Sequence, residues 1–144
     1  MAVIKEKKIK LSSVIENLLE TGLADGEPER SEETADGFLK LGDDGVMTIS
    51  YVRVEDSSRV ATDIVITCDT VRVTRGGDLR SDMLFSEGVR HTSLYEVPPY
   101  SFDAEIYTRK IRRAMDKDGG RIDIFYTMRI GGADKNVRMR IECV

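Results

Sequence analysis

The residues most able to do chemistry lie around His91, the single histidine of the chain. Ser93 and Tyr95 follow it at intervals of two residues, so the three side chains would share one face of a β-strand. An imidazole and two hydroxyl groups can donate and accept hydrogen bonds around a small ligand. A hydrolase in which His91 serves Ser93 as a base is the weaker hypothesis, because no orienting acid and no G-x-S-x-G motif accompanies them. We therefore expect binding and not catalysis.

A second group of polar residues alternates along the next segment, at Tyr107, Arg109 and Arg113. If both faces meet inside a β-barrel, they surround one cavity with donors, and arginine holds carboxylates and phosphates in a planar fork. The alternatives are a buried polar network that closes the barrel and an exposed polar face. The predicted site for a small amphipathic or anionic ligand comprises His91, Ser93, Tyr95, Tyr107, Arg109 and Arg113. It requires these side chains to point to one side of the sheet.

Composition narrows the remaining functions. The 144 residues suit one domain, residues 1–144, and the net charge of -4 argues against a nucleic-acid partner. One histidine and two cysteines exclude the common zinc sites, and no glycine-rich phosphate loop is present, so we expect no cofactor. No apolar run approaches the ~18 residues of a membrane span, and the start MAVIKEKKIK has no export signal. We expect a cytoplasmic protein without a membrane partner, in which Cys68 and Cys143 are reduced and pack as small hydrophobic residues. The alternative is a disulfide between them, which requires that the fold bring the two residues together.

The elements that must position the candidate residues are short alternating segments between Asp-Gly and Gly-Gly turn signals. The clearest is the pair of segments 121–130 and 136–143 around Gly131-Gly132, which predicts a hairpin. Its apolar faces, which we expect to form core, are Ile122, Ile124, Tyr126, Met128 and Ile130, then Val137, Met139, Ile141 and Cys143. Such spacing predicts an antiparallel sandwich or barrel.

Two segments are ambiguous. Residues 13–22 read as a helix with a capping box from Ser13 to Glu16 and a closing Gly22, yet they also alternate as a strand does. The acidic stretch 25–36 is expected to be a solvated loop or the charged start of a strand.

The segments 90–98 (RHTSLYEVP) and 105–110 (EIYTRK) resemble the small bacterial YwiB-like proteins, whose pattern runs R-H-x-S-x-Y-x-T-P-Y-G and then Y-T-K-K. Residues 83–88 (MLFSEG) and 48–51 (TISY) resemble the same family. The resemblance implies an all-β fold, an antiparallel calycin/lipocalin-like β-barrel of about 8–10 strands, and favours a strand over 13–22. It implies no reaction.

Two positions depart from that family. The turn at 97–100 reads Val97-Pro98-Pro99-Tyr100 and lacks the family's glycine, so we expect it to be remodelled. Arg113 stands where relatives carry an aliphatic residue, and inside a barrel it would need a partner or a wet lumen.

A barrel of this size either holds one small ligand or is filled by its own side chains. We therefore consider two hypotheses for the function: a ligand-binding module, and a non-enzymatic interaction or structural module. The second has a barrel filled by large residues such as Tyr51, Phe85, Tyr107, Tyr126 and Met128. The sequence leaves open whether the protein is a monomer or a homodimer.

Overall fold

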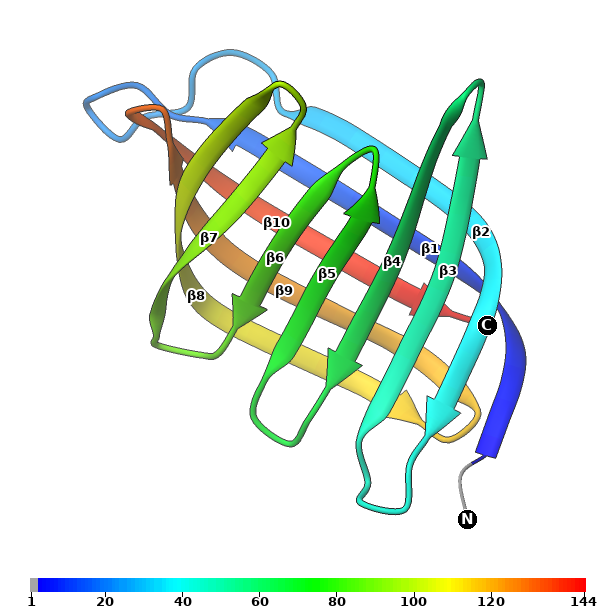
Figure 1. The fold of residues 1–144 in the computed structure, drawn as a ribbon. Helices are drawn as coiled ribbons and strands as arrows, with labels where there is room; N and C mark the ends of the chain where they lie inside the picture. The colour runs from blue at the N-terminus through cyan, green and yellow to red at the C-terminus, as the bar shows by residue number, and fades with distance from the viewer. Residues whose placement is uncertain (1–2) are drawn as a thin grey trace.

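The protein is a closed antiparallel barrel of ten strands (Figure 1), seen in a computed structural model that describes residues 3–144. Each strand pairs with its neighbours in the chain, and β1 closes the barrel against β10. The all-β prediction is therefore confirmed, with the strand number at the top of the expected range. The strands are β1 (Val3–Asn17), β2 (Glu29–Leu41), β3 (Met47–Glu55), β4 (Ser58–Ile66), β5 (Val71–Gly77), β6 (Arg80–Phe85), β7 (Arg90–Val97), β8 (Tyr100–Asp116), β9 (Gly119–Ile130) and β10 (Ala133–Cys143).

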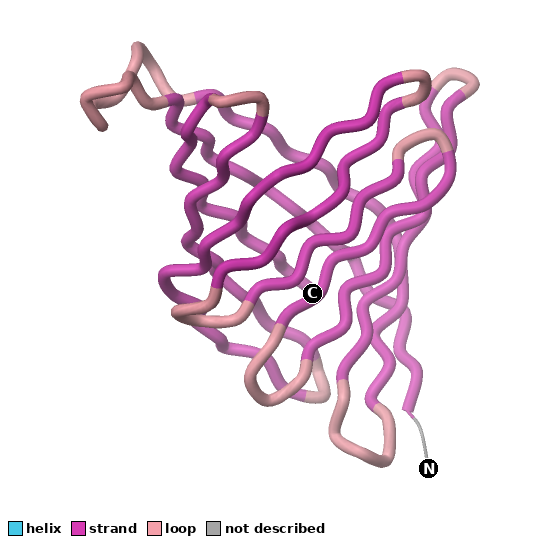
Figure 2. The backbone as a smooth tube through the Cα atoms, turned by 60° about the vertical axis from the view of Figure 1, so that its left-hand side comes forward, coloured by secondary structure: helices cyan, strands magenta, loops and turns pink. Residues whose placement is uncertain are grey.

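The ambiguous segment 13–22 begins as a strand. Ser13 pairs with Met139 of β10 on one side and with Ser31 of β2 on the other, and β1 continues to Asn17. The chain then turns, and Gly22 adopts the positive φ of 84° that a glycine tolerates. Figure 2 shows the resulting loop, residues 18–28, at one end of an arrangement made of strands and short turns.

That end of the barrel, which we call the upper end, also carries the β3–β4, β5–β6, β7–β8 and β9–β10 turns (Figure 1). The turn between β7 and β8 is built by Pro98 and Pro99, joined by a cis peptide bond, in place of the family's glycine turn. The lower end carries the other four turns.

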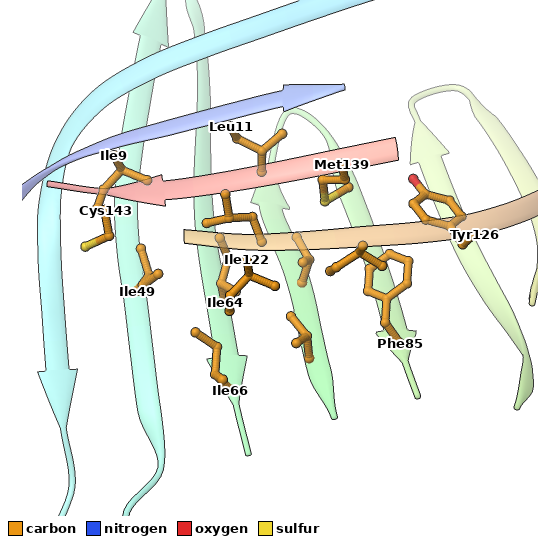
Figure 3. Packing of buried hydrophobic residues seen from close by; sticks show 14 of the residues in the cluster. Ile9, Leu11, Ile49, Ile64, Ile66, Phe85, Ile122, Tyr126, Met139 and Cys143 are labelled. Carbon is orange, nitrogen blue, oxygen red and sulfur yellow. The ribbon is translucent and has the colours of Figure 1, made fainter. Parts of the chain in front are cut away.

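The centre of the barrel is filled by apolar side chains. Ile64 lies on β4 and Phe85 on β6, at the front of the barrel in Figure 1, while Ile122 and Tyr126 lie on β9 at the back, and all four side chains are buried. Figure 3 shows these side chains directed toward one another, and the rings of Phe85 and Tyr126 lie 4.8 Å apart. The inner faces predicted for β9 and β10 are confirmed for Ile122, Ile124, Tyr126, Val137, Met139, Ile141 and Cys143, which are all buried. The other two predicted residues are less enclosed, since Met128 is partly buried against the core and Ile130 is half-buried.

The two cysteines are both free thiols, and they lie in different environments. Cys143 is buried in the core as predicted, and burial raises its pKa. Cys68 is exposed, so the prediction that it packs as a small hydrophobic residue is wrong. It lies beyond the last residue of β4, where the alternation no longer has a barrel wall to face.

Two seams interrupt the wall of the barrel. β2 pairs with β3 through residues 37–41 and 47–51, while residues 29–36 of β2 pair with β1. β6 pairs with β7 through residues 80–82 and 94–96. Gly37 lies where β2 leaves β3, and a Cβ there would lie 2.4 Å from the carbonyl oxygen of Ser50. The close approach of the two backbones therefore requires glycine at this corner.

Candidate functional site

A charged cluster lies inside the upper half of the barrel, beside the β2–β3 seam. Arg75 donates to Glu33 Oε1 through Nη2 at 2.7 Å, and Arg53 donates to Glu33 Oε2 through Nη1 at 3.3 Å. The hydroxyl of Tyr51 donates to Glu33 Oε1 at 3.1 Å. Only 15% of the Glu33 side chain and 20% of the Arg75 side chain are exposed. We call these four residues the Glu33 cluster.

Strand register explains how the cluster forms. Tyr51 pairs with Thr62 and Thr62 pairs with Arg75, so the three side chains follow one row across the inner faces of β3, β4 and β5. Arg53 lies two residues after Tyr51 on the same face. Glu33 reaches the row from β2 at the seam, where β2 has separated from β3.

The environment of Tyr51 keeps its hydroxyl protonated. Burial, together with the negative charge of Glu33, raises the pKa of Tyr51 to about 12, although Arg75 acts in the opposite direction. Burial also raises the pKa of Tyr126, again with Arg75 opposing. Tyr51 is therefore a hydrogen-bond donor to the carboxylate throughout the neutral range.

A cavity of about 260 Å³ opens beside the cluster. Its polar wall contains Glu33, Arg53 and Arg75, and its apolar wall contains Leu11 and Met139. Two guanidinium groups face one carboxylate, and each uses one nitrogen for its hydrogen bond to Glu33. Arg53 also forms an ion pair with the exposed Glu55 at 3.9 Å, so the charges around the two guanidinium groups are balanced. Because a guanidinium has five N–H groups, the cluster still offers donors able to hold an anion.

A second cavity, of about 250 Å³, is also lined by Arg75. Ser81 and Leu94 contribute to its wall, as do the charged residues Arg80, Asp82 and Glu96. Asp82 is already engaged by Arg72, whose Nε and Nη2 donate to its two carboxylate oxygens, and this ion pair lowers the pKa of Asp82. Arg75 is thus the residue that the two cavities share.

The first three residues of the predicted site share one face of β7, which we call the histidine face. His91, Ser93 and Tyr95 lie on the inner face of β7, with Ser93 buried and the other two half-buried. Within residues 3–144, the buried side-chain nitrogen and oxygen atoms without a hydrogen-bond partner are His91 Nε2, Ser93 Oγ and, on the adjacent strand, Thr108 Oγ1. These groups line the inner wall without forming a connected network.

The structure does not bring Tyr107 and Arg109 to that face. Tyr107 pairs with Arg90, whose guanidinium lies over the outer tyrosine ring at 5.5 Å, and Arg109 is exposed. A β-bulge between Thr108 and Lys110 adds one residue to β8, so the alternation that joined Tyr107 to Arg113 changes face there. The predicted arrangement of six residues around one cavity is therefore wrong in geometry.

Arg113 does face inward, at the lower end of the barrel. It pairs with the buried Ile122 and donates to the main-chain oxygens of Thr67 and Thr70. The partner that an inward arginine was expected to need is thus the β4–β5 loop. Arg113 also lines a lower cavity of about 360 Å³ with Cys68 and Glu87, far along β8 from the histidine face.

The Glu33 cluster was not among the residues predicted from the sequence. Its arginines carry a usable signal, since Arg53 alternates with Ile49 and Tyr51, and Arg75 alternates with Val71 and Val73. Glu33 carries no such signal, because it lies in the acidic stretch that reads as solvated. No group of three or more His, Cys, Asp or Glu in residues 3–144 is arranged to hold a metal ion. The same residues contain no helix long and apolar enough to cross a membrane.

Comparison with known proteins agrees with this architecture. Residues 17–141 match the family described as a domain of unknown function, DUF1934. The chain is 26% identical over 129 residues to the uncharacterized β-barrel protein YwiB of Bacillus subtilis strain 168, covering 90% of this chain and 85% of that protein. The crystal structure of YwiB superposes with a TM-score of 0.78 at 24% identity, covering 96% of this chain and 92% of the other, which shows a shared fold.

Proposed function

We propose, from the premise that this chain belongs to the DUF1934 family of β-barrel proteins, that it binds a small organic anion at the upper end of its barrel. Arg75 and Arg53 would hold the anion, and Leu11 and Met139 would contact an apolar part of the ligand. Glu33 and Tyr51 position the two guanidinium groups before the ligand arrives.

One observation carries this proposal: a largely buried Arg–Glu–Arg cluster borders a cavity of about 260 Å³. Placing charged groups in a barrel interior costs desolvation energy, and a well-packed apolar set of the same volume is often equally stable or more stable. Arg75 uses one nitrogen for Glu33, and its other N–H groups favour an anion because charge-assisted hydrogen bonds from arginine hold carboxylates and phosphates. The position at the rim also fits the packed centre, which leaves the ends of the barrel for a ligand.

The packed centre is also the observation that favours the second candidate, an interaction or structural module without a small ligand. In that case the Glu33 cluster only closes the upper end. The two functions differ in what Arg75 does, because only the ligand-binding function needs its remaining donors.

The test is a thermal-shift and native mass-spectrometry screen with fatty acids and phosphorylated metabolites. We expect at least one anion to stabilise the wild-type protein and to lose this effect in Arg75→Gln. The matched control is Arg138→Gln, which removes an exposed arginine from the outer face of β10. A screen without any bound anion, or equal binding to Arg75→Gln, would overturn the proposal and favour the interaction module.

A further inference from the structure

A row of inner-face residues continues from Arg75 across three further strands at the upper end. Arg75 pairs directly with Ser81 of β6, and Ser81 pairs with Tyr95 of β7. Tyr95 in turn pairs with Phe102 of β8. Directly paired residues in an antiparallel sheet place their side chains on the same face. The four side chains therefore lie next to one another, in this order, along the inner wall of the barrel.

The far end of this row is an exposed aromatic pair. β8 pairs with β9 only from Ala104 onward, so Phe102 and Tyr100 extend beyond β9. Their rings stack with centroids 6.5 Å apart and an interplanar angle of 22°. Phe102 is 43% exposed and Tyr100 is 65% exposed, although both lie on the inward side of the hairpin. Exposed aromatic rings of this kind offer a flat surface on which another ring can stack.

The chemistry of the row changes in order along its length. It begins at a guanidinium, passes Ser81, which is only 8% exposed, and the half-buried Tyr95, and ends at the stacked rings of Phe102 and Tyr100. Neighbouring strands lie about 4.8 Å apart, so the three steps from Arg75 to Phe102 span roughly 15 Å. This length and order match an anion joined through a hydroxylated spacer to a flat aromatic ring.

We propose that the row binds a free mononucleotide, with its phosphate at Arg75, its ribose beside Ser81 and Tyr95, and its base stacked on Phe102 and Tyr100. This inference rests on the proposed function and names its ligand class, with the apolar contact made by Phe102 and Tyr100 in place of Leu11 and Met139. A fatty acid fits less well, because its alkyl chain would cover two hydroxyl groups. A nucleic-acid strand fits less well because the whole chain carries a net charge of -4.

The test compares adenosine monophosphate with ribose 5-phosphate by isothermal titration calorimetry. The two probes share phosphate and ribose and differ by the base. We expect the nucleotide to bind the wild-type protein about tenfold more tightly, which is the size of effect that one good ring stack supplies. Phe102→Ala should abolish this difference and leave ribose 5-phosphate binding unchanged. The control Phe38→Ala removes a similarly exposed ring, 50% against 43% for Phe102, from the outer face of β2 and should preserve the difference.

The outcomes separate the two proposals. If both probes bind equally to the wild type and both lose affinity in Arg75→Gln, the anion site stands and the mononucleotide assignment is overturned. If Arg75→Gln binds both probes as the wild type does, the proposed function fails and the inference fails with it. A short single-stranded RNA is the third probe, and tighter binding of the RNA than of the mononucleotide would overturn the assignment to a free nucleotide.

Discussion

Replacing Glu33 with glutamine should lower the stability of the fold and strengthen anion binding at the same time. Glu33 accepts hydrogen bonds from Tyr51, Arg53 and Arg75, and two of these donors are charged. Glutamine keeps one acceptor oxygen and loses the charge. A hydrogen bond to a charged group contributes about 1.5–3 kcal/mol, so losing one of them and weakening another predicts a loss of about 2 kcal/mol in the free energy of unfolding. Breaking a fully buried pair would cost about 3–5 kcal/mol, which is an upper limit because Arg53 is 35% exposed.

The gain in affinity follows from the same geometry. An anion held by Arg75 would lie within about 6 Å of the Glu33 carboxylate, and at an effective dielectric constant of 20 that repulsion is about 3 kcal/mol. Solvent at the rim screens part of it, so we expect anion affinity to rise about tenfold in Glu33→Gln. Urea unfolding followed by circular dichroism gives the stability, and calorimetric titration of the anion gives the affinity.

The matched control is Asp36→Asn, on the outer face of the same strand. Asp36 forms an exposed ion pair with Lys8 at 3.6 Å, and pairs of this kind contribute about 0–1 kcal/mol. The control should therefore change stability and affinity little. Weaker anion binding in Glu33→Gln, or unchanged stability, would refute the assignment of Glu33 as the internal counterion of an anion site.

Three further predictions concern the barrel itself. Gly37→Ala should destabilise the fold by about 3 kcal/mol in urea, because the added Cβ would lie 2.4 Å from a carbonyl oxygen; normal stability would show that β2 can move away from β3. Thr108→Val should stabilise the fold by about 1 kcal/mol, because it removes a buried hydroxyl without a partner among the described residues; a clear loss in the same assay would show that the hydroxyl is bound. The pKa of Tyr51 is raised from 10 to about 12 in the folded state, so its contribution to stability is complete below pH 10 and is lost as the pH rises toward 12. The free energy of unfolding, measured across that pH range, should fall less in Tyr51→Phe than in the wild type, with a difference of up to about 2 kcal/mol. Parallel pH profiles of the two proteins would contradict the raised pKa.

Much of the fold could be predicted because, in a regular antiparallel strand, the alternation of apolar and polar residues shows which face is buried. β9 and β10 pair without a shift from Gly120 to Cys143, so the predicted apolar face is buried except toward the upper end, where Met128 and Ile130 are half-buried. Residues 13–22 are ambiguous in sequence because Ser13 and Glu16 fit a helix start and Gly22 fits its end, and only the part up to Asn17 belongs to β1. The two neighbouring strands settle it, and their pairing is not visible in the local sequence.

The predicted site failed at one position in β8. The bulge after Thr108 depends on contacts with a distant turn, in which Thr108 exchanges main-chain hydrogen bonds with Gly88 and Val89. Glu87 also accepts a hydrogen bond from the Ile111 main-chain nitrogen at 2.6 Å. Alternation assumes an unbroken strand, so it assigned Tyr107 and Arg113 to one face although the bulge separates them.

The sequence did not predict the Glu33 cluster, and the reason is different from that for β8. Arg75 lies 42 residues after Glu33, and the two meet because β2 leaves β3 at Gly37 and opens a seam. A charged residue in an acidic stretch gives no sign of which neighbours it will face in the folded chain. Strand alternation alone could have placed Arg53 and Arg75 inside the barrel, and the structure adds the carboxylate between them.

The most direct test of the anion site is an NMR titration that follows the Nε–Hε resonances of the arginines as inorganic phosphate is added. The Arg75 resonance should shift and saturate, with a smaller response at Arg53, while the exposed Arg138 on the outer face should not respond. A uniform response of all arginines, or no response at Arg75, would contradict the central claim that the upper end of this barrel is built to hold an anion.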